Sequence, residues 1–305
     1  MEWGIDLPHR GRHAGRQPLL RFARLAEQLG FDSGWVSDHI AWPPSVASKY
    51  PYSDDGSFAS PPDLPWFDPI GSMFFVAACT ERLKLGSTVL VLGYRPPMLT
   101  AKAMASLDAL SDGRVILGVG IGWMREEFEV LSMPYEHRGA RADEQLELFR
   151  TLFSESRPRF SGSYYTVPEI GFEPKPVGGA VPIWVGGSSE PAYRRVARFG
   201  DAFHAAFQPL EQVAAAWSRV KDLSDEHGRS PGEVHLTMRL YLDPNGSMPP
   251  EKSIAGSPEQ MADTIGAWSG IGVDHIVLDP GVNRDLDARQ AAMEGFMTDV
   301  APRVG

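Results

Sequence analysis

The feature that most constrains the fold of this chain is a regular alternation of short apolar runs with longer segments of helical periodicity. Eight runs are candidate β-strands, at residues 3–7, 34–38, 84–89, 114–120, 182–187, 201–205, 234–241 and 275–279. Several are apolar at consecutive positions, which is typical of strands buried on both faces of a parallel sheet. This order predicts an α/β fold, a (β/α)₈ barrel. A doubly wound open sheet is the alternative, but no Gly-x-Gly-x-x-Gly follows the first run.

Four segments between these runs have apolar residues at helical spacing, and we expect each set to form the apolar face of a helix. The sets are Phe22, Leu25, Ala26 and Leu29; Leu99, Ala103, Leu107 and Leu110; Ala142, Leu146, Phe149 and Phe153; and Met261, Ile265 and Trp268. Gly30 is placed to end the first helix. Ser257 and Gln260, with Pro258 after the serine, form the signature of a capping box at the start of the fourth.

Three connections are longer than the few residues usual between neighbouring elements. They cover residues 40–68, 122–137 and 157–181, and the third contains a segment typical of a small hairpin. The first two follow the second and fourth strands, at the end of a barrel where active sites lie. No repeat, low-complexity tract or interdomain linker is visible, so we expect residues 1–305 to form a single domain with insertions after strands two and four.

Composition excludes several classes of protein. The net charge of −10 and the pI of about 5.3 argue against a nucleic-acid-binding protein. Cys79 is the single cysteine, which excludes an intrachain disulfide and a cysteine metal cluster, and we expect it to pack in the core. No apolar stretch approaches the roughly 20 residues of a membrane span, and the N-terminal stretch has no apolar signal core. We therefore expect a cytoplasmic protein that binds neither nucleic acid nor membrane.

Asp38 and His39 stand where the second strand ends. Neighbouring side chains alternate along a strand, but at its carboxyl end both can face the barrel mouth, where barrel enzymes hold catalytic groups. A histidine in this position can donate or accept a proton near neutral pH. The alternative is that both residues only bond or cap a loop, and the sequence leaves it open.

Glycines near two strand ends admit two interpretations. The small residues Gly86, Ser87 and Thr88 would let a flat ligand approach the backbone, or they belong to an ordinary strand and turn. Gly118, Gly120 and Gly122 alternate at the end of the fourth strand. They either expose backbone to a ligand or relieve crowding inside the barrel.

The fifth strand ends in a candidate anion site. Gly186 and Gly187 are followed by Ser188 and Ser189, which open a helix. Free amides and hydroxyls at the start of a helix bind anions, most often phosphate. Because both glycines allow close approach, phosphate binding is favoured over N-capping alone.

Other polar residues give weaker signals. The chain has no His-x-His pair after the first strand, no His-Glu-x-x-His motif and no Gly-x-Ser-x-Gly elbow, which argues against a metal hydrolase or a serine hydrolase of that type. We expect His9, His13 and His137 in surface loops, whereas His204 is a candidate for the barrel mouth. The run at residues 125–127 is typical of a solvated loop or helix start.

Several stretches, in this order, make the chain resemble the bacterial luciferase-like monooxygenase superfamily, and more narrowly its branch of coenzyme F420-dependent oxidoreductases. They are GWVSDHI, KYPYSDDG with PPDLPWFDP, GSTVLVLGYRPPMLTAK, LDALSDGRVILGVGIGWMREEFEVL, HRGARADEQLELFRTLF and PIWVGGSSEPAYRRVARFGD. Together they cover nearly the whole chain and are specific for the superfamily. They are less specific for the cofactor, because FMN enzymes share the scaffold.

The resemblance implies a (β/α)₈ barrel that binds a deazaflavin or flavin ring at the carboxyl ends of its strands. Asp38 would lie against the cofactor, and His39 would be the proton donor or acceptor beside the reactive ring carbon. Thr88 and Val89 match a non-proline cis peptide that bulges against the ring.

The resemblance also implies the remaining contacts of the cofactor. The matching positions after the fourth strand are Ile121, Gly122 and Glu126, and those of the phosphate-binding segment are Gly187, Ser188 and Ser189. Members of the superfamily are commonly dimeric, so a homodimer is expected.

One position departs from the pattern. The F420-dependent sugar-phosphate dehydrogenases of this superfamily carry a catalytic glutamate where this chain has Trp123. Together with Trp42 and Trp66, this residue predicts a large apolar substrate pocket. The leading hypothesis is hydride transfer between F420 and a small organic substrate, such as reduction of a C=C or C=N bond. The alternatives are an FMN-dependent monooxygenase, which would use reduced flavin, oxygen and a flavin reductase, and a non-catalytic cofactor-binding protein.

Overall fold

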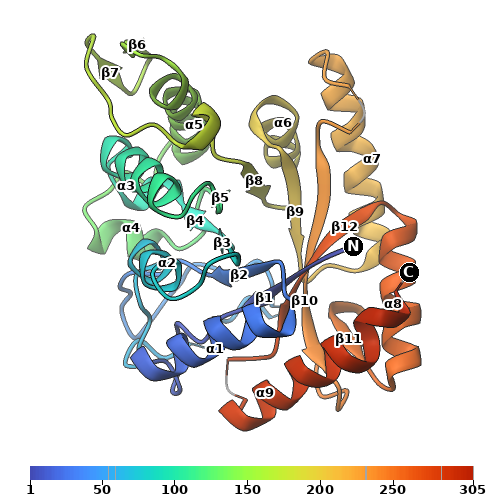
Figure 1. The fold of residues 1–305 in the computed structure, drawn as a ribbon. Coiled ribbons are helices and arrows are strands. Elements are labelled where there is room, and N and C mark those ends of the chain that lie inside the picture. The colour runs from blue at the N-terminus through green and yellow to red at the C-terminus, as the bar shows by residue number, and fades with distance from the viewer. Residues whose placement is uncertain (54, 59, 231, 283, 305) are drawn as a thin grey trace.

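Eight parallel strands close into a barrel at the centre of the molecule (Figure 1). The computed structural model describes residues 1–53, 55–58, 60–230, 232–282 and 284–304. In order around the ring, the strands are β1 (Glu2–Asp6), β2 (Ser33–Val36), β3 (Lys84–Ser87), β5 (Val115–Gly120), β8 (Ile183–Gly186), β9 (Ala202–Ala206), β10 (His235–Asp243) and β12 (Val273–Asp279). The ring closes because β12 also pairs with β1, where Trp3 lies opposite Ile276. The predicted (β/α)₈ barrel is confirmed.

Helices follow each barrel strand and lie outside the ring (Figure 1). They are α1 (Arg16–Leu29), α2 (Pro69–Ala77), α3 (Pro97–Leu110), α4 (Arg125–Val130), α5 (Arg138–Ser154), α6 (Glu190–Phe199), α7 (Leu210–Glu226), α8 (Pro258–Gly270) and α9 (Leu286–Gly295). Shorter helical segments are η1 (Leu92–Tyr94), η2 (Val177–Gly179), η3 (Pro250–Lys252), η4 (Phe296–Val300) and η5 (Ala301–Arg303). Gly30 ends α1 in the left-handed conformation, and Ser257 and Gln260 form the predicted capping box of α8.

Helix α3 faces the core with a different stripe from the one that its leucines predict. Met104 and Leu107 are buried, but Leu99 is 67 % exposed and Leu110 is 74 % exposed. Leu99 and Leu110 are eleven residues apart, about three full turns, so they lie on the same side of the helix, while the buried residues Thr100, Met104 and Leu107 lie about 80–140° around the helix axis from Leu99. The prediction was therefore wrong at both ends of this set, whereas the sets on α1, α5 and α8 pack against the core.

The third barrel strand is interrupted. β3 ends at Ser87, the Thr88–Val89 peptide bond is cis, and β4 (Leu90–Val91) then resumes pairing with β5. The cis peptide implied by the resemblance is therefore present. Two further features lie outside the ring: β11 (Ser253–Ala255) pairs with β10, and β6 (Phe160–Ser161) with β7 (Thr166–Val167) forms the predicted hairpin.

Trp35 fills the interior of the barrel. It is fully buried, and its ring lies 4.8 Å from that of Trp184 and 5.4 Å from the imidazole of His204. A Cβ atom added at Gly86 would overlap the Trp35 ring, and one at Gly118 would overlap the carbonyl oxygen of Ser87. Gly86 makes room for the Trp35 side chain and Gly118 for the backbone of the neighbouring strand, so the flat-ligand interpretation of Gly86 is wrong.

Gly120 and Gly122 also stand where a side chain would not fit. Added Cβ atoms at Gly120 and Gly122 would collide with Val89 and Phe128 respectively. Relief of crowding, one of the two interpretations of this alternation, therefore accounts for all three glycines of the fourth strand end.

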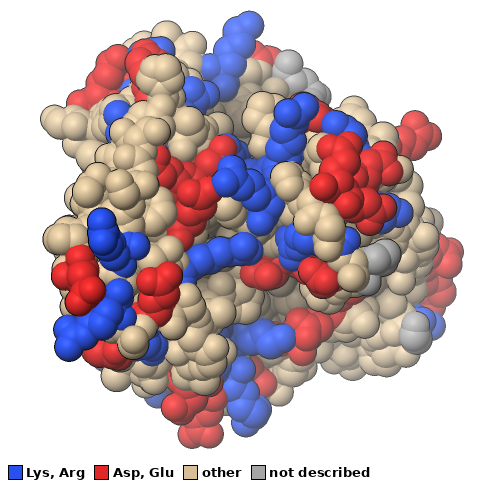
Figure 2. Space-filling model, turned by 90° about the horizontal axis from the view of Figure 1, so that it is seen from above, with Lys and Arg blue, Asp and Glu red and all other residues tan. Residues whose placement is uncertain are grey.

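Acidic and basic side chains are interleaved over the face seen in Figure 2. Several such charges pair between neighbouring elements, as Arg219 of α7 does with Glu190 of α6 at 2.7 Å. Within the described ranges, no helix is both long enough and apolar enough to cross a membrane.

Candidate active site

Asp38 and His39 lie just beyond the carboxyl end of β2, which stops at Val36. Both are buried, with 4 % and 8 % of their surface exposed. His9 holds the turn that carries them, because its Nε2 accepts the N–H of Ser37. The surface position expected for His9 was wrong: its ring is fully buried, and loss of solvent lowers its pKa well below the ordinary value.

The carboxylate of Asp38 points to Arg95 and binds it with both oxygens, at 2.7 and 2.9 Å. It also accepts the N–H of Val91 at 2.9 Å. Burial raises the pKa of Asp38, although the bonds from Arg95 oppose that rise. The same Nη2 of Arg95 that donates to Asp38 also donates to Asp68, at 2.6 Å. One arginine thus joins the two ends of the 40–68 connection.

His39 bonds to a residue that the sequence analysis missed, Glu127 of α4. Nδ1 of His39 lies 2.6 Å from Oε2 of Glu127, which also accepts the hydroxyl of Tyr94 at 2.8 Å. Oε1 of Glu127 accepts the backbone N–H groups of Ile40 and Ala41 at 2.5 and 3.1 Å. The helix start expected at residues 125–127 is confirmed, because α4 begins at Arg125, but Glu127 has no exposed surface, so the expected exposure to solvent was wrong at this position.

A sequence signal for Glu127 does exist. Met124 and Phe128 are both fully buried, and they stand three residues before and one residue after it. The spacing 124, 127, 128 is that of one helix face. A carboxylate on the apolar face of a helix is uncommon unless it has partners, and that combination could have identified it.

Aromatic rings surround the imidazole of His39. Ring centroids lie 5.3 Å away for Trp42, 4.9 Å for Phe58, 4.8 Å for Trp66 and 6.0 Å for Trp123. Three of these rings come from the 40–68 connection, and Trp123 comes from the segment after β5. We call these four residues the aromatic enclosure.

The cis peptide lies at the top of the barrel interior. Oγ1 of Thr88 is 3.0 Å from Nε2 of His204, and the carbonyl oxygen of Thr88 accepts from Arg239 at 3.2 Å. Burial lowers the pKa of His204 to about 3, so this imidazole is neutral. Since it stacks on Trp35 and bonds to Thr88 and Thr237, His204 supports the interior.

The three positions predicted after the fourth strand have different surroundings. Ile121 packs against the main core. Gly122 has a φ of 77°, and its carbonyl oxygen accepts from Arg138. Oε1 of Glu126 accepts the N–H groups of Ala47 and Ser48, while its Oε2 is buried and has no partner among the described residues.

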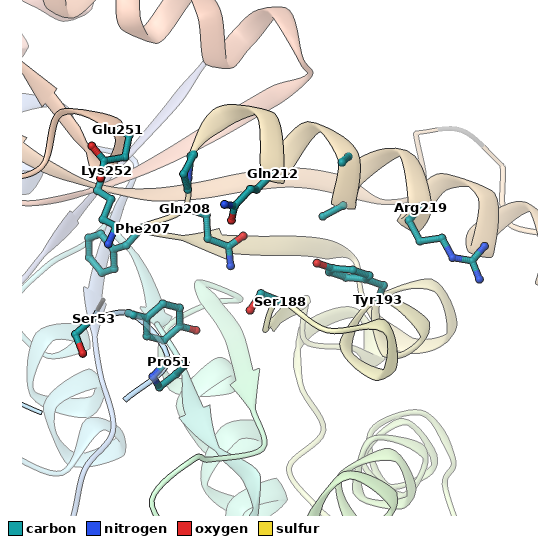
Figure 3. A pocket seen from close by; sticks show the side chains of 14 residues that line it. Pro51, Ser53, Ser188, Tyr193, Phe207, Gln208, Gln212, Arg219, Glu251 and Lys252 are labelled. Atoms are coloured by element: carbon teal, nitrogen blue, oxygen red, sulfur yellow. The ribbon is translucent and has the colours of Figure 1, made fainter. Parts of the chain in front are cut away.

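The predicted anion segment lies beside a cavity of about 680 Å³. Figure 3 shows Ser188 and Tyr193 on one side of it and Gln208 and Gln212 on the other. Ser189 is the N-cap residue of α6, yet its side chain makes no capping bond, so its hydroxyl is not used by the helix. Gly187 has a φ of 128°, and a Cβ there would crowd Ala192. Tyr52, from the 40–68 connection, also lines the cavity.

Comparisons with known proteins identify similar sequences and similar folds. A family model described as luciferase-like monooxygenase matches residues 1–242. An uncharacterised protein of Mycobacterium tuberculosis is 37 % identical over 215 residues, which cover 70 % of this chain and 74 % of that protein.

A relative with a named activity is the F420-dependent glucose-6-phosphate dehydrogenase of Beutenbergia cavernae. It is 37 % identical over 190 residues, which cover 61 % of this chain but only 51 % of the relative. Among solved structures, the monooxygenase RslO1 from Streptomyces bottropensis superimposes with a TM-score of 0.80 over 100 % of both chains. At 21 % identity, that likeness concerns the fold.

Proposed function

Because this chain belongs to the luciferase-like monooxygenase family, we propose that it is an oxidoreductase that transfers a hydride between coenzyme F420 and a small organic substrate. The observation that carries the proposal is His39, which stands at the barrel mouth inside the aromatic enclosure. A relative that is 37 % identical is named as F420-dependent, which favours this cofactor.

The described residues offer suitable groups for such a cofactor. Ser188, Ser189 and the N-terminus of α6 would bind its phosphate beside the cavity. The unpartnered Oε2 of Glu126 would accept a donor from the cofactor. When bound, the cofactor supplies the hydride chemistry, while the protein positions it and excludes water.

His39 would exchange the proton that accompanies the hydride. In the reducing direction, a C=C or C=N bond gains a hydride at one atom and a proton from His39 at the other, and oxidation is the reverse. General acid–base catalysis of this kind contributes about 10²–10⁴-fold to the rate.

The aromatic enclosure favours an apolar substrate. Rings of Trp42, Phe58 and Trp123 offer apolar surface and π-faces around His39, and they provide no carboxylate of their own. Since Trp123 also replaces the glutamate of the sugar-phosphate dehydrogenases, oxidation of a sugar phosphate is not part of the proposal.

Fluorescence titration of the purified protein with F420 and, separately, with FMN tests the cofactor. We expect tight binding of F420 and turnover that needs no oxygen. Preference for FMN together with oxygen consumption in the presence of a flavin reductase would instead indicate a monooxygenase. Tight F420 binding with no turnover in a broad substrate screen would indicate a non-catalytic binding protein.

We also propose that the protein is a homodimer, as the resemblance implies. Light scattering of the purified protein measures its molar mass and tests this directly, because a monomer has the mass of one chain, 33.5 kDa.

A further inference from the structure

We propose that Glu127 is the positioning residue of His39: it fixes the proton on Nδ1 and leaves Nε2 as the atom that exchanges a proton with substrate. The effect of Glu127 on turnover rests on the proposed function. The tautomer itself is a property of the cofactor-free protein.

The bonding pattern of Glu127 determines where the proton lies. A carboxylate oxygen can only accept, so Nδ1 of His39, at 2.6 Å from Oε2, must carry a hydrogen. Burial, followed by the neighbouring Glu127, raises the pKa of Tyr94, so its phenol stays protonated and donates to the same oxygen. With the N–H groups of Ile40 and Ala41 on Oε1, four donors converge on one buried carboxylate.

Other charged groups near His39 are already engaged. The adjacent Asp38 binds both of its oxygens to Arg95, and Arg95 in turn pairs with Asp68. The remaining neighbours of the imidazole are the rings of the aromatic enclosure. In the described part of the chain, Glu127 is the one charged side chain that bonds to the His39 ring, and Nε2 has no bonding partner.

The tautomer decides whether Nε2 can work in either direction. To accept a proton, Nε2 needs a free lone pair, which it has only when Nδ1 holds the hydrogen of the neutral ring. To donate a proton, the ring must first be an imidazolium, whose charge the carboxylate on Nδ1 stabilises. Without Glu127, both directions of the proton transfer would be slower.

Glu127→Gln gives a sharp test because the structure predicts how the new amide orients. The N–H groups of Ile40 and Ala41 can only donate, so they hold the amide oxygen at the position of Oε1. The amide NH₂ then takes the position of Oε2 and faces Nδ1 of His39 and the oxygen of Tyr94. Nδ1 must become an acceptor, and the proton of the neutral ring moves to Nε2.

Nitrogen NMR of protein with ¹⁵N-labelled histidine, without cofactor and under mildly alkaline conditions, distinguishes the two tautomers. His39→Ala identifies the His39 signals by their loss. We expect a protonated Nδ1 in the wild type and a protonated Nε2 in Glu127→Gln. Glu126→Gln is the matched control: Glu126 lies on the same helix and holds the same connection through Ala47 and Ser48, but it does not bond to His39. It should keep the wild-type tautomer.

With F420 and a substrate, Glu127→Gln should lower kcat at least about 100-fold with KM changed less than about 3-fold, since proton transfer and not binding is affected. Glu126→Gln should mainly raise the KM for F420, because Glu126 is proposed to bind the cofactor.

A proton on Nε2 in the wild-type spectrum overturns the proposal without any variant. An unchanged tautomer in folded Glu127→Gln overturns it as well, as does an inverted tautomer with wild-type kcat. If the wild type shows the expected tautomer but no turnover with F420, the proposed function fails and the tautomer assignment stands.

Discussion

Arg95 forms ion pairs with the buried Asp38 and the exposed Asp68. Comparing replacements of Arg95 and of Asp68 separates the contributions of the two pairs to stability. The Asp38 side chain has no exposed surface, whereas that of Asp68 is 52 % exposed. In Arg95→Met, Asp38 would keep one donor, the N–H of Val91. Loss of one partner of a buried ion pair costs about 3–5 kcal/mol, while an exposed pair contributes about 0–1 kcal/mol.

We therefore expect Arg95→Met to lower the free energy of unfolding by about 3–5 kcal/mol. Asp68→Asn should lower it by less than about 1 kcal/mol. The asparagine can still accept the N–H of Gly71 as the N-cap of α2, so this control removes charge without removing the cap.

The cost of Arg95→Met should depend on pH. Burial already raises the pKa of Asp38, and without Arg95 it rises further. An acid whose folded-state pKa is raised contributes stability that is complete below its unfolded pKa and is lost as the pH rises through the folded pKa. The destabilisation should therefore be larger at about pH 8 than at about pH 5.

Urea denaturation followed by tryptophan fluorescence measures both effects. The double variant Asp38→Asn with Arg95→Met should be more stable than Arg95→Met alone, because no buried charge remains without its partner. The reasoning is refuted if Arg95→Met costs less than about 1 kcal/mol, or if Asp68→Asn costs as much as Arg95→Met.

Three further predictions concern the site and the barrel. His39→Ala should retain F420 affinity by fluorescence titration but lose about 10²–10⁴-fold in kcat, and full activity would remove His39 from the mechanism. Ser188→Asp should weaken F420 binding strongly in the same titration, because the new carboxylate repels the phosphate; unchanged affinity would move the phosphate site elsewhere. The pKa of Glu2 is lowered from 4.5 to about 2, chiefly by its bond to His275. Glu2→Gln should therefore lower the free energy of unfolding at neutral pH, by less than about 1 kcal/mol because Glu2 is half exposed. This difference from the wild type should vanish as the pH falls from about 4.5 towards 2, which urea denaturation across that range measures.

The barrel was predictable because its strands leave a strong local signal. Runs that are apolar on consecutive residues report burial on both faces, and the eight runs are the eight strands of the ring. The break after Ser87 was predictable only through the resemblance, since nothing in the local pattern at Thr88 and Val89 distinguishes a cis from a trans peptide.

What the sequence did not reveal depends on contacts between distant segments. Glu127 becomes a buried acceptor because His39 and the backbone after it lie within bonding distance, although 88 positions separate the two residues in the chain. His9 is buried because Ser37 and Trp66 close over it. Helical spacing likewise indicates a stripe of apolar residues on α3, but not which stripe meets the barrel.

The bond of Arg95 to both Asp38 and Asp68 frees the stretch between them to vary. One guanidinium fixes the two ends of that stretch at the barrel, whatever residues lie between. Doubling the length of a flexible loop adds only about 0.6 kcal/mol of closure entropy. Evolution or protein engineering can therefore exchange much of this segment, including the rings of Trp42 and Phe58, while Trp66, which bonds to the carbonyl oxygen of Ser37, stays and His39 keeps its place. For the proposed oxidoreductase, this one segment is therefore the part of the barrel whose replacement changes the surroundings of His39, and with them the substrate, at the least cost to the fold.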